Sequence, residues 1–464
     1  MSQMKVNNLT EGSVAKRLIT FALPMLLSNI IQSFYNVADM LIVGRFNGPA
    51  GISAVNTGGQ VTFLMTMMVM GLCIGGTVII AQYVGAKQVE KIQSTISTML
   101  ISLVVAAVAI TTVMLFLSTP ILHLINTPPE AFDEARAYLN ITVVGVIFIF
   151  LYNAMSAIMR GTGDSKTPMV FVAIACVTNI VLDYIMVGPM DMGAAGAALA
   201  TVISQALSMV LCVIHLKRSN FAFNFKLSSF KFDREQFGLL IKIGLPISVQ
   251  NVVSNISFLF LTSLVNAFGV LASSALGIIG KFNSFAIMPA LAISASVSTL
   301  TAQNMGANRP DRVKKTLFTG MATAFSITAV VFIIAQLFPA QILSLFDNTP
   351  EMIAIGVLYM GLFAFEYLVV PFMFCLNGLI NGSGHSMVTA INNVCAALVF
   401  RMPLAYLLSQ YMGLRGIALS VPLSSLAATT ISLGYFLSGK WKHSRVVKNS
   451  ELNELTEAAA LASD

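Results

Sequence analysis

The chain alternates long apolar runs with short polar breaks, a pattern typical of a protein that crosses a membrane many times. A bilayer core about 30 Å thick needs about 20 consecutive apolar residues per helix, and twelve runs reach that length. The predicted spans cover residues 15–45, 51–82, 93–120, 136–160, 167–188, 193–216, 237–267, 271–303, 313–345, 352–381, 387–411 and 414–439. The expected fold is therefore that of an all-α polytopic membrane protein with 12 transmembrane helices.

An internal repeat divides these spans into two sets of six. Short motifs recur in the same order after 220–222 residues. The matching pairs are Leu23-Pro24 with Leu245-Pro246, Ala81-Gln82 with Ala302-Gln303, Asn126-Thr127-Pro128 with Asn348-Thr349-Pro350, Gly161-Thr162-Gly163 with Gly382-Ser383-Gly384, and Met192-Gly193 with Met412-Gly413. Six is an even number, so both halves enter the membrane from the same side, as in transporters built from parallel repeats. We therefore expect two pseudo-symmetric six-helix lobes.

The least apolar internal segment lies between the two halves and places the domain boundaries. We predict an N-terminal lobe at residues 1–216, a basic cytoplasmic linker at 217–236 and a C-terminal lobe at 237–440. A polar cytoplasmic tail follows at 441–464, and we expect it to fray from Trp441 onward. Little of the chain remains for a domain outside the membrane.

Composition excludes several classes of protein. Hydrophobic residues make up 56% of the chain and charged residues 10%, whereas an average soluble domain carries about 25% charged residues. The five cysteines lie in apolar runs without a CxxC pair, and the sequence contains no P-loop, metal-ligand spacing or nucleophile–base motif. We therefore expect neither an enzyme nor an ATP-driven pump, and we expect no cofactor.

The 26 lysines and arginines are distributed unevenly between the loops. With the N-terminus in the cytoplasm, 21 of them fall on the cytoplasmic side and three, Arg45, Arg136 and Arg415, fall outside; Lys281 and Arg401 lie within apolar runs. The positive-inside rule then favours both termini in the cytoplasm. The same rule accounts for the net charge of +7, so we do not expect a nucleic-acid partner.

Acidic residues deep within apolar runs are candidates for function, because each costs about 2.5–3.5 kcal/mol to insert. Three positions qualify: Asp39, Asp183 and Glu366. Tyr35 lies one helical turn before Asp39 and Asn179 one turn before Asp183, so each pair shares a helix face. Together with Thr201 of the following span, these groups offer oxygen atoms that suit a proton or Na⁺. Either they couple an ion to transport, or they are neutral, hydrogen-bonded packing residues.

Several motifs resemble those of the MATE (multidrug and toxic compound extrusion) transporters. They lie between about residues 10 and 440 and comprise the LP-x₄-N opening of spans 1 and 7, Val43-Gly44-Arg45, Ala81-Gln82-Tyr83-Val84-Gly85, Met159-Arg160-Gly161-Thr162-Gly163-Asp164 and Asn179-Ile180-Val181-Leu182-Asp183. In detail the chain is most similar to the bacterial DinF- and MepA-like branch. The resemblance implies a V-shaped pair of six-helix lobes that exports organic cations in exchange for protons or sodium.

The resemblance also implies roles for individual residues. It implies a cation-coupling site in the N-terminal lobe, formed by Asp39, Asp183, Asn179, Thr201 and Tyr35. The first four of these are possible Na⁺ ligands. Tyr138 is expected to join the site, and Pro24 matches a family proline associated with bending of span 1.

The C-terminal half does not repeat this cluster. The repeat offset places Leu261 at the position of Asp39, Arg401 at that of Asn179 and Ala405 at that of Asp183. This half holds Glu366, Arg401 and Lys281 in its spans instead. An ion pair between Glu366 and Arg401 is one interpretation, since buried charges need partners. A substrate cavity or a second coupling site is the other.

We interpret the chain as a secondary active multidrug efflux antiporter of the bacterial inner or plasma membrane. It is expected to export amphipathic, mostly cationic organic compounds in exchange for H⁺ or Na⁺, by alternating access between the lobes, as a monomer in the lipid bilayer. A lipid-linked oligosaccharide or lipid flippase of the same superfamily is an alternative, but it needs a more cationic cavity than Lys281 and Arg401 provide. A channel or a scaffold is disfavoured by the intrachain repeat and the acidic cluster.

The orientation can be tested by cysteine labelling. Single cysteines placed within residues 130–134 should react with a membrane-impermeant reagent from outside the cell, because the loop bias puts that segment outside. Cysteines placed within residues 309–315 should react only in inverted vesicles. The opposite pattern of accessibility would refute the predicted topology.

Overall fold

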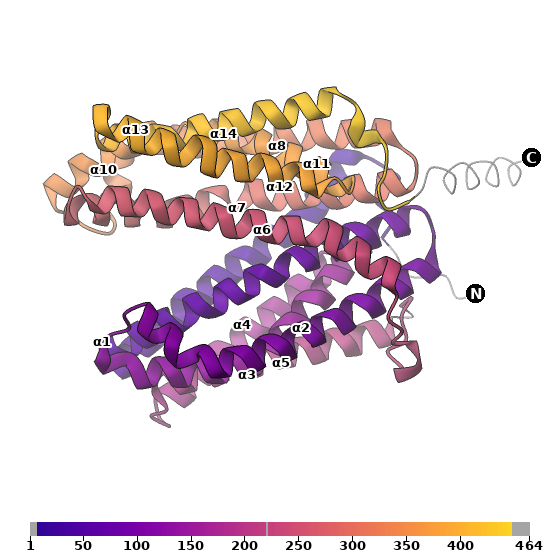
Figure 1. Cartoon of the computed structure of the whole chain (residues 1–464), viewed down its shortest axis with the longest axis horizontal. Coiled ribbons are helices and arrows are strands. Elements are labelled where there is room, and N and C mark those ends of the chain that lie inside the picture. Colours follow the sequence, from indigo (N-terminus) through magenta and orange to yellow (C-terminus); the bar gives the residue numbers. More distant parts are fainter. Residues whose placement is uncertain (1–6, 220, 448–464) are drawn as a thin grey trace, which may run out of the picture. The chain divides into compact units, whose positions relative to one another are not determined.

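The computed structural model describes residues 7–219 and 221–447, and within these ranges the chain forms helices and no strand (Figure 1). The predicted all-α fold is confirmed. Apolar runs become helices because a lipid environment leaves backbone N–H and C=O groups no partner except each other. The helices are α1 (Val14–Gly85), α2 (Val89–Leu124), α3 (Pro129–Gly161), α4 (Lys166–Val187), α5 (Gly193–Arg218), α6 (Arg234–Asn266), α7 (Val270–Gly306), α8 (Pro310–Leu337), α9 (Pro339–Ser344), α10 (Pro350–Phe363), α11 (Glu366–Gly382), α12 (Ser386–Cys395), α13 (Met402–Met412) and α14 (Leu414–Leu437).

Helix α1 is two membrane spans that join at Gly48. A straight helix of 72 residues would be about 108 Å long at 1.5 Å per residue. Yet both Asn7, which precedes it, and Ile80, near its end, lie against the same turn at residues 161–163. The chain therefore reverses at Gly48, whose φ of 66° and ψ of −160° suit a residue without a Cβ atom.

The predicted spans agree with the observed helices, with differences in three places. Ten helices in the described ranges are long and apolar enough to cross a bilayer, with residues Ser386–Met412 counted as one helix. Helices α10 and α11 form one further span, bent by 43°. The reversal in α1 divides that helix into two spans and adds another. This gives the expected twelve. The sequence pattern did not predict the break after Phe363, the π-helical turn Ala396–Arg401 between α12 and α13, or the short separate helix α9.

The internal repeat is visible in the backbone. Residues with positive φ, a conformation that most residues avoid, recur at offsets of 220–221 residues. The pairs are Gly48 with Gly269, Lys87 with Asn308, Gly163 with Gly384, and Gly193 with Gly413. The connections between the spans are therefore built alike in the two halves.

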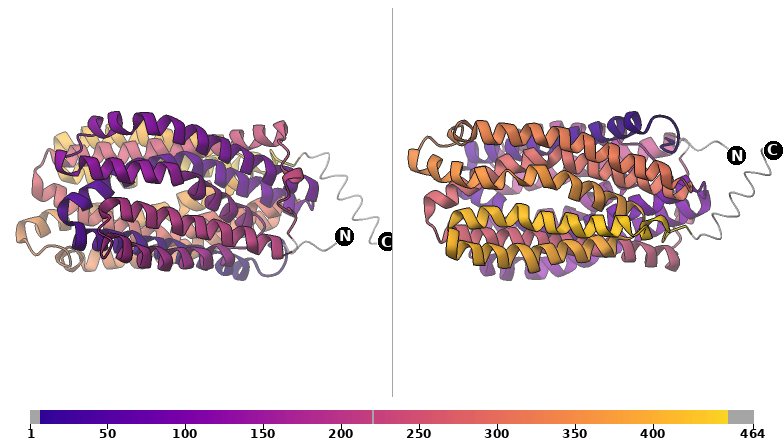
Figure 2. Two further views of the ribbon diagram at one scale, coloured as in Figure 1. Left: turned by 90° about the horizontal axis from the view of Figure 1, so that it is seen from below. Right: turned by 90° about the horizontal axis from the view of Figure 1, so that it is seen from above.

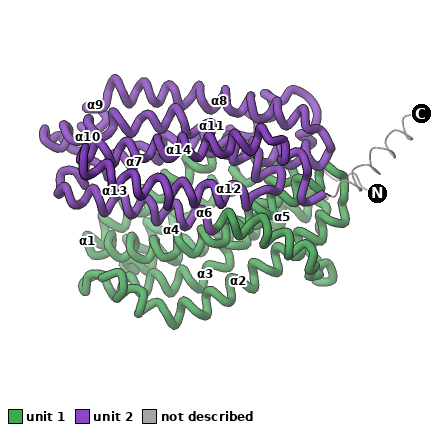
Figure 3. Tube along the Cα trace, turned by 45° about the horizontal axis from the view of Figure 1, so that its top comes forward, with its two compact units in different colours: residues 1–7, 27–248 green, residues 8–26, 249–464 purple. Residues whose placement is uncertain are grey.

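The chain forms two compact units, and their boundaries differ from the predicted lobes (Figure 3). Unit 1 contains Leu27–Ser248 and Asn7, whereas unit 2 contains Asn8–Leu26 and the described residues from Val249 onward. Each unit thus includes the first part of a span that was assigned to the other half. Within each unit the helices run alongside one another (Figure 2).

Specific contacts hold the exchanged segments in place. In unit 2, the Leu9 N–H donates to Gln303 Oε1 at 3.0 Å, and Arg309 Nη1 donates to the carbonyl of Thr10 at 2.8 Å. In unit 1, Ser248 Oγ donates to the carbonyl of Met68 at 2.6 Å. Long-range contacts of this kind are not visible in hydropathy, which explains why the compact units divide the chain at other residues than the predicted lobes.

The linker between the halves packs on the first turns of α2 within unit 1. Ser94 Oγ donates to Asp233 Oδ2 at 2.6 Å, and this bond lowers the pKa of the Asp233 carboxyl. Ser97 Oγ donates to the carbonyl of Lys231 at 2.7 Å, and Phe223 is buried. The linker is therefore a folded part of unit 1.

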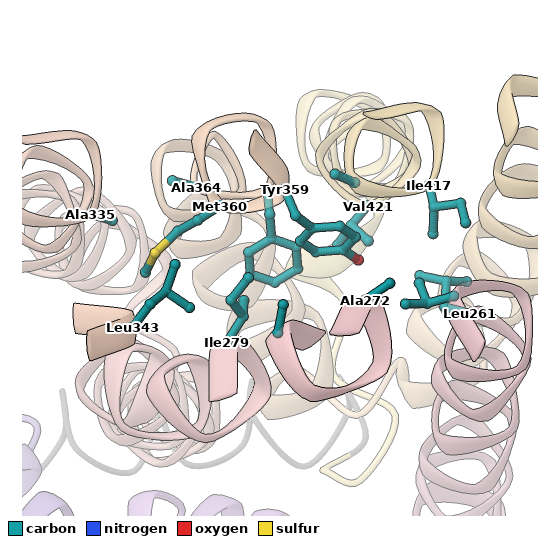
Figure 4. Packing of buried hydrophobic residues seen from close by; sticks show 14 of the residues in the cluster. Leu261, Ala272, Ile279, Ala335, Leu343, Tyr359, Met360, Ala364, Ile417 and Val421 are labelled. Atoms are coloured by element: carbon teal, nitrogen blue, oxygen red, sulfur yellow. The ribbon is translucent and has the colours of Figure 1, made fainter. Parts of the chain in front are cut away.

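One apolar core cluster of unit 2 is contributed mainly by α6, α7, α10 and α14. Figure 4 shows Ile279, Tyr359, Met360 and Val421 lying together in this cluster. Tyr359 also stacks on Phe363, with ring centroids 6.0 Å apart. This packing supports the end of α10, directly before the break at which α11 begins.

The start of the C-terminal tail is docked, contrary to the expectation that it frays. Trp441 is 1% exposed, stacks on Phe436 at 5.6 Å and donates its indole N–H to the Phe436 carbonyl. His385 fixes the next turn, since its Nε2 lies 2.8 Å from the His443 carbonyl. Val447 is also buried. The rest of the predicted tail, residues 448–464, lies outside the described residues.

Removing the Trp441 side chain should destabilise unit 2. Trp441→Ala leaves a cavity in the cluster that contains Leu18 and Leu317, and truncating a buried tryptophan costs about 3–5 kcal/mol. The thermal midpoint of the purified protein in detergent should therefore fall by several degrees. Lys442→Ala, an exposed neighbour, is the control and should not change it; equal midpoints for both variants would show that the docked segment contributes no stability.

Candidate functional site

The two aspartates predicted to act together do meet inside unit 1. Asp39 comes from the first span of α1 and Asp183 from α4, and they are 7% and 0% exposed. Their carboxyl groups lie close enough to interact electrostatically. Two neighbouring carboxylates repel each other when both are ionised.

Hydroxyl and amide groups join the aspartates. The Tyr35 hydroxyl lies 2.9 Å from Thr201 Oγ1, and Asn179 Nδ2 donates to the same Thr201 oxygen at 3.5 Å. Thr201 of α5 therefore connects α1 to α4. All five residues that the sequence placed in this site are brought together, and we call them the carboxyl cluster: Tyr35, Asp39, Asn179, Asp183 and Thr201.

Tyr138 of α3 also belongs to this region, as the sequence indicated. It is 7% exposed and interacts electrostatically with Asp39 and Asp183. Its ring packs against Gly58 in the second span of α1, where a Cβ atom would lie 2.5 Å from Tyr138 Cδ1. Gly58 therefore determines how closely Tyr138 approaches the cluster. Sequence reasoning missed Gly58, since nothing local marks a glycine that contacts a distant ring.

The carboxyl cluster has unused capacity to bind a cation. In the described part of the chain, four of its buried oxygen atoms have no hydrogen-bond partner: Asp39 Oδ1, Asn179 Oδ1, and Oδ1 and Oδ2 of Asp183. A buried acceptor without a partner costs about 1–3 kcal/mol, and two adjacent carboxylates also repel each other. A proton or a hard cation such as Na⁺ removes both costs. The residues present therefore fit the possible Na⁺ site.

The acidic residue of unit 2 is bound differently. Glu366, at the start of α11, accepts a hydrogen bond from Ser425 Oγ at 2.7 Å, while Arg401 Nε donates to Ser424 Oγ at 3.1 Å. Arg401 also lies over the ring of Phe258, 4.6 Å from its centroid. Glu366 and Arg401 attract each other, but no ion pair within 4.0 Å joins them among the described residues. The predicted direct ion pair is therefore replaced by adjacent serines of α14.

Two further predicted site residues lie apart from these groups. Lys281 of α7 is exposed, whereas Glu366 and Arg401 are both 7% exposed. Pro24 lies where α1 keeps helical dihedral angles, two residues before Leu26, at which the chain passes from unit 2 to unit 1. A bend at Pro24 stays a prediction.

Comparison with known proteins gives a consistent result over nearly the whole chain. The family model described as MatE matches residues 24–185 and 246–407, two ranges that begin at the repeat offset. The probable multidrug resistance protein YpnP of Bacillus subtilis is 28% identical over 443 residues, which cover 95% of this chain and 98% of that protein.

Solved structures share the fold at low sequence identity. A MOP superfamily transporter from Pyrococcus furiosus, whose structure is described as suggesting a different function through reversed polarity of its binding pocket, aligns with a TM-score of 0.88 and 23% identity. The alignment covers 95% of this chain and all of that one. A multidrug resistance MATE family transporter in an outward-facing conformation aligns with a TM-score of 0.87, also at 23% identity, over 95% of this chain and 98% of its own.

The attraction between Glu366 and Arg401 can be measured by a double-mutant cycle. Arg401→Gln removes the opposite charge from a buried carboxylate, so it should lower the thermal midpoint more than Glu366→Gln with Arg401→Gln together. Because each of the two groups binds its own serine and no ion pair joins them, the coupling should be modest, about 1 kcal/mol. Midpoints of the four proteins in detergent give the coupling. Additive losses would mean that the two charges do not interact.

Proposed function

Because the chain belongs to the MatE family of multidrug efflux transporters, and is therefore a multi-spanning membrane transporter and not an enzyme, we propose that it is a secondary active antiporter. It exports amphipathic, mostly cationic organic compounds in exchange for H⁺ or Na⁺. The coupling ion binds at the carboxyl cluster of unit 1. The positive-inside distribution of lysine and arginine supports an orientation with both termini in the cytoplasm.

The observation that supports this function most directly is the set of unpartnered oxygens on Asp39, Asn179 and Asp183. A purely structural cluster would satisfy its polar atoms internally, since unsatisfied buried groups destabilise the fold. Here the protein's own side chains leave the requirement open. A group that is completed only by a proton or a cation responds to the ion gradient across the membrane, as coupling requires.

We propose that ion binding at the cluster is transmitted through α1. Asp39 lies on α1 within unit 1, and residues 14–26 of the same helix belong to unit 2. A change in charge at Asp39 therefore acts on a helix that both units share. By linkage, an ion that stabilises one conformation must alter the affinity for the exported compound in that conformation, and the compound must alter ion affinity equally.

The flippase alternative receives less support from the cations of unit 2. A pyrophosphate headgroup needs accessible positive charges, preferably the fork of an arginine. Arg401 is buried, bound to Ser424 and covered by Phe258. Of Arg401 and Lys281, only Lys281 is exposed. One ammonium group is a weak basis for recognising a diphosphate.

The decisive variants are Asp39→Asn and Asp183→Asn. Each keeps the volume of the side chain but cannot exchange a proton and binds a cation more weakly, so gradient-driven efflux should fall to the level of vesicles without the protein. Thr201→Ala should reduce efflux only about fivefold, because it removes a hydrogen bond worth about 1 kcal/mol. Efflux is measured in inverted vesicles with ΔpH and ΔpNa imposed separately, which also identifies the ion.

The control is Asp133→Asn, the same chemical change at an exposed residue of unit 1 that pairs with Arg136 at 3.5 Å. It should transport at the normal rate. Protein amounts in the membrane must match in all variants. Normal gradient-driven efflux by Asp39→Asn would show that the coupling ion binds elsewhere.

A further inference from the structure

A polar pocket of unit 1 lies between the linker and the first turns of α2. Its wall includes Glu90, Ser94 and Ser97 of α2 and Asn224 and Lys231 of the linker. Its empty volume is about 740 Å³, within the range of small-molecule sites, about 300–1,000 Å³. None of the described wall residues belongs to the carboxyl cluster, so the proposed transport mechanism does not account for this pocket.

The sequence of α2 indicates the depth of the pocket in the membrane. Apolar residues dominate α2 from Met99 to Leu117, a stretch about 29 Å long that matches a hydrocarbon core about 30 Å thick. Ser97 and Glu90 precede Met99 by two and nine residues, which places them about 3 and 14 Å beyond the edge of the hydrocarbon. The wall of the pocket therefore begins in the layer of lipid headgroups and extends toward water.

Hydrogen bonds fix the linker at this level. The Lys231 N–H donates to Ser97 Oγ at 2.6 Å, and the Asp233 N–H donates to Thr98 Oγ1 at 3.0 Å. One helical turn farther out, Gln93 Nε2 donates to the carbonyl of Ala222 at 2.6 Å. The backbone of Lys231 is thus held beside Ser97, at the deeper end of the pocket.

The two charged residues of the wall lie at different depths. Glu90 and Ser97 are seven residues apart on one face of α2, so the Glu90 backbone lies about 10 Å farther from the hydrocarbon than Ser97 and Lys231. Glu90 and Lys231 are both exposed, and no ion pair within 4.0 Å joins them among the described residues. The pocket therefore offers a positive charge near the hydrocarbon and a negative charge nearer to water.

Other groups of the linker complete the deeper part of the pocket. Asn224 Oδ1 accepts hydrogen bonds from the Lys226 N–H and the Ser229 hydroxyl, which leaves the Asn224 amide NH₂ to donate. Ser228 is exposed and adds a hydroxyl to the wall. Together with the Lys231 ammonium, these donors suit a phosphate group. Leu227 beside them is 91% exposed, which leaves an apolar side chain for lipid to cover.

We propose that this pocket binds the headgroup of a phosphatidylethanolamine from the surrounding membrane leaflet. Such a headgroup carries its phosphate next to the hydrocarbon and its primary ammonium group farther out, in the same order as Lys231 and Glu90. The phosphate accepts from Lys231, Asn224 and Ser228, and the ammonium group donates to the Glu90 carboxylate. An anionic headgroup that lacks an ammonium group would leave Glu90 repelling the phosphate, so the pocket selects against it.

The proposal is tested by lipid binding to the full-length protein in detergent, measured by native mass spectrometry with phosphatidylethanolamine and phosphatidylglycerol. The protein should bind phosphatidylethanolamine about tenfold more tightly, the effect of one hydrogen bond between charged groups. Glu90→Gln should abolish this preference, and Glu90→Lys should reverse it. Lys231→Gln should weaken the binding of both lipids, because both carry the phosphate.

Matched controls exclude a structural effect of the substitutions. Glu235→Gln and Lys226→Gln make the same changes at exposed residues outside the wall, and both should bind the two lipids normally. Glu90 also lies in the first turn of α2, where a carboxylate stabilises the helix whichever lipid is present. A purely structural role of Glu90 would therefore lower the thermal midpoint without changing the lipid preference.

The outcomes decide the proposal independently of the coupling ion. Equal affinities for the two lipids, or tighter binding of phosphatidylglycerol by the unmodified protein, would show that the basic linker only attracts negative charge and would overturn the site. An unchanged preference in Glu90→Lys would overturn it as well. Asp39→Asn should bind both lipids normally, so failure of the proposed antiport mechanism would leave this result intact.

Discussion

The structure depends on one constraint, which is that a buried polar group in the membrane must have a partner. Backbone groups meet it by forming helices, so the chain is helical wherever it is apolar. Serine and threonine hydroxyls meet it by donating to carbonyls one turn earlier, as Thr77 does to Cys73 and Thr328 does to Ala324. Asp39 and Asp183 are among the buried residues whose oxygens do not meet it with the side chains around them, and the proposed transport mechanism starts from these two carboxyl groups.

The same constraint explains the asymmetry between two halves that share one backbone plan. Paired residues of positive φ show that the connections were kept in both. Leu261 and Ala405 stand where unit 1 has its aspartates. In unit 2, Glu366 Oε1 accepts a hydrogen bond from Ser425, and Arg401 donates one to Ser424. Unit 2 therefore has a single buried carboxyl group beside a buried arginine where unit 1 has two aspartates, although Glu366 Oε2 also lacks a hydrogen-bond partner among the described residues.

Much of this arrangement could be predicted from the sequence because it depends on local spacing. The twelve spans follow from apolar length, and Tyr35 with Asp39 and Asn179 with Asp183 follow from the period of the α-helix. The exchanged segments at Asn8–Leu26 and before Val249 could not be predicted, because hydropathy does not indicate which neighbours a helix contacts. The docking of Trp441 was missed for the same reason, since its stacking partner and the cluster around it arise only in the folded unit.

The exchange of segments also bears on how an ion bound in one unit affects the other. A helix confined to one unit transmits a change only through side-chain packing. Helix α1 instead continues from unit 2 into unit 1 between Leu26 and Leu27, and Asp39 lies thirteen residues beyond Leu26, about 20 Å along the helix axis. Gln303 and Arg309 hold residues 9 and 10, which directly precede α1, within unit 2. In the proposed mechanism, α1 is therefore the element through which an ion at the carboxyl cluster acts on the conformation, because coupling between two sites requires an element that both of them affect.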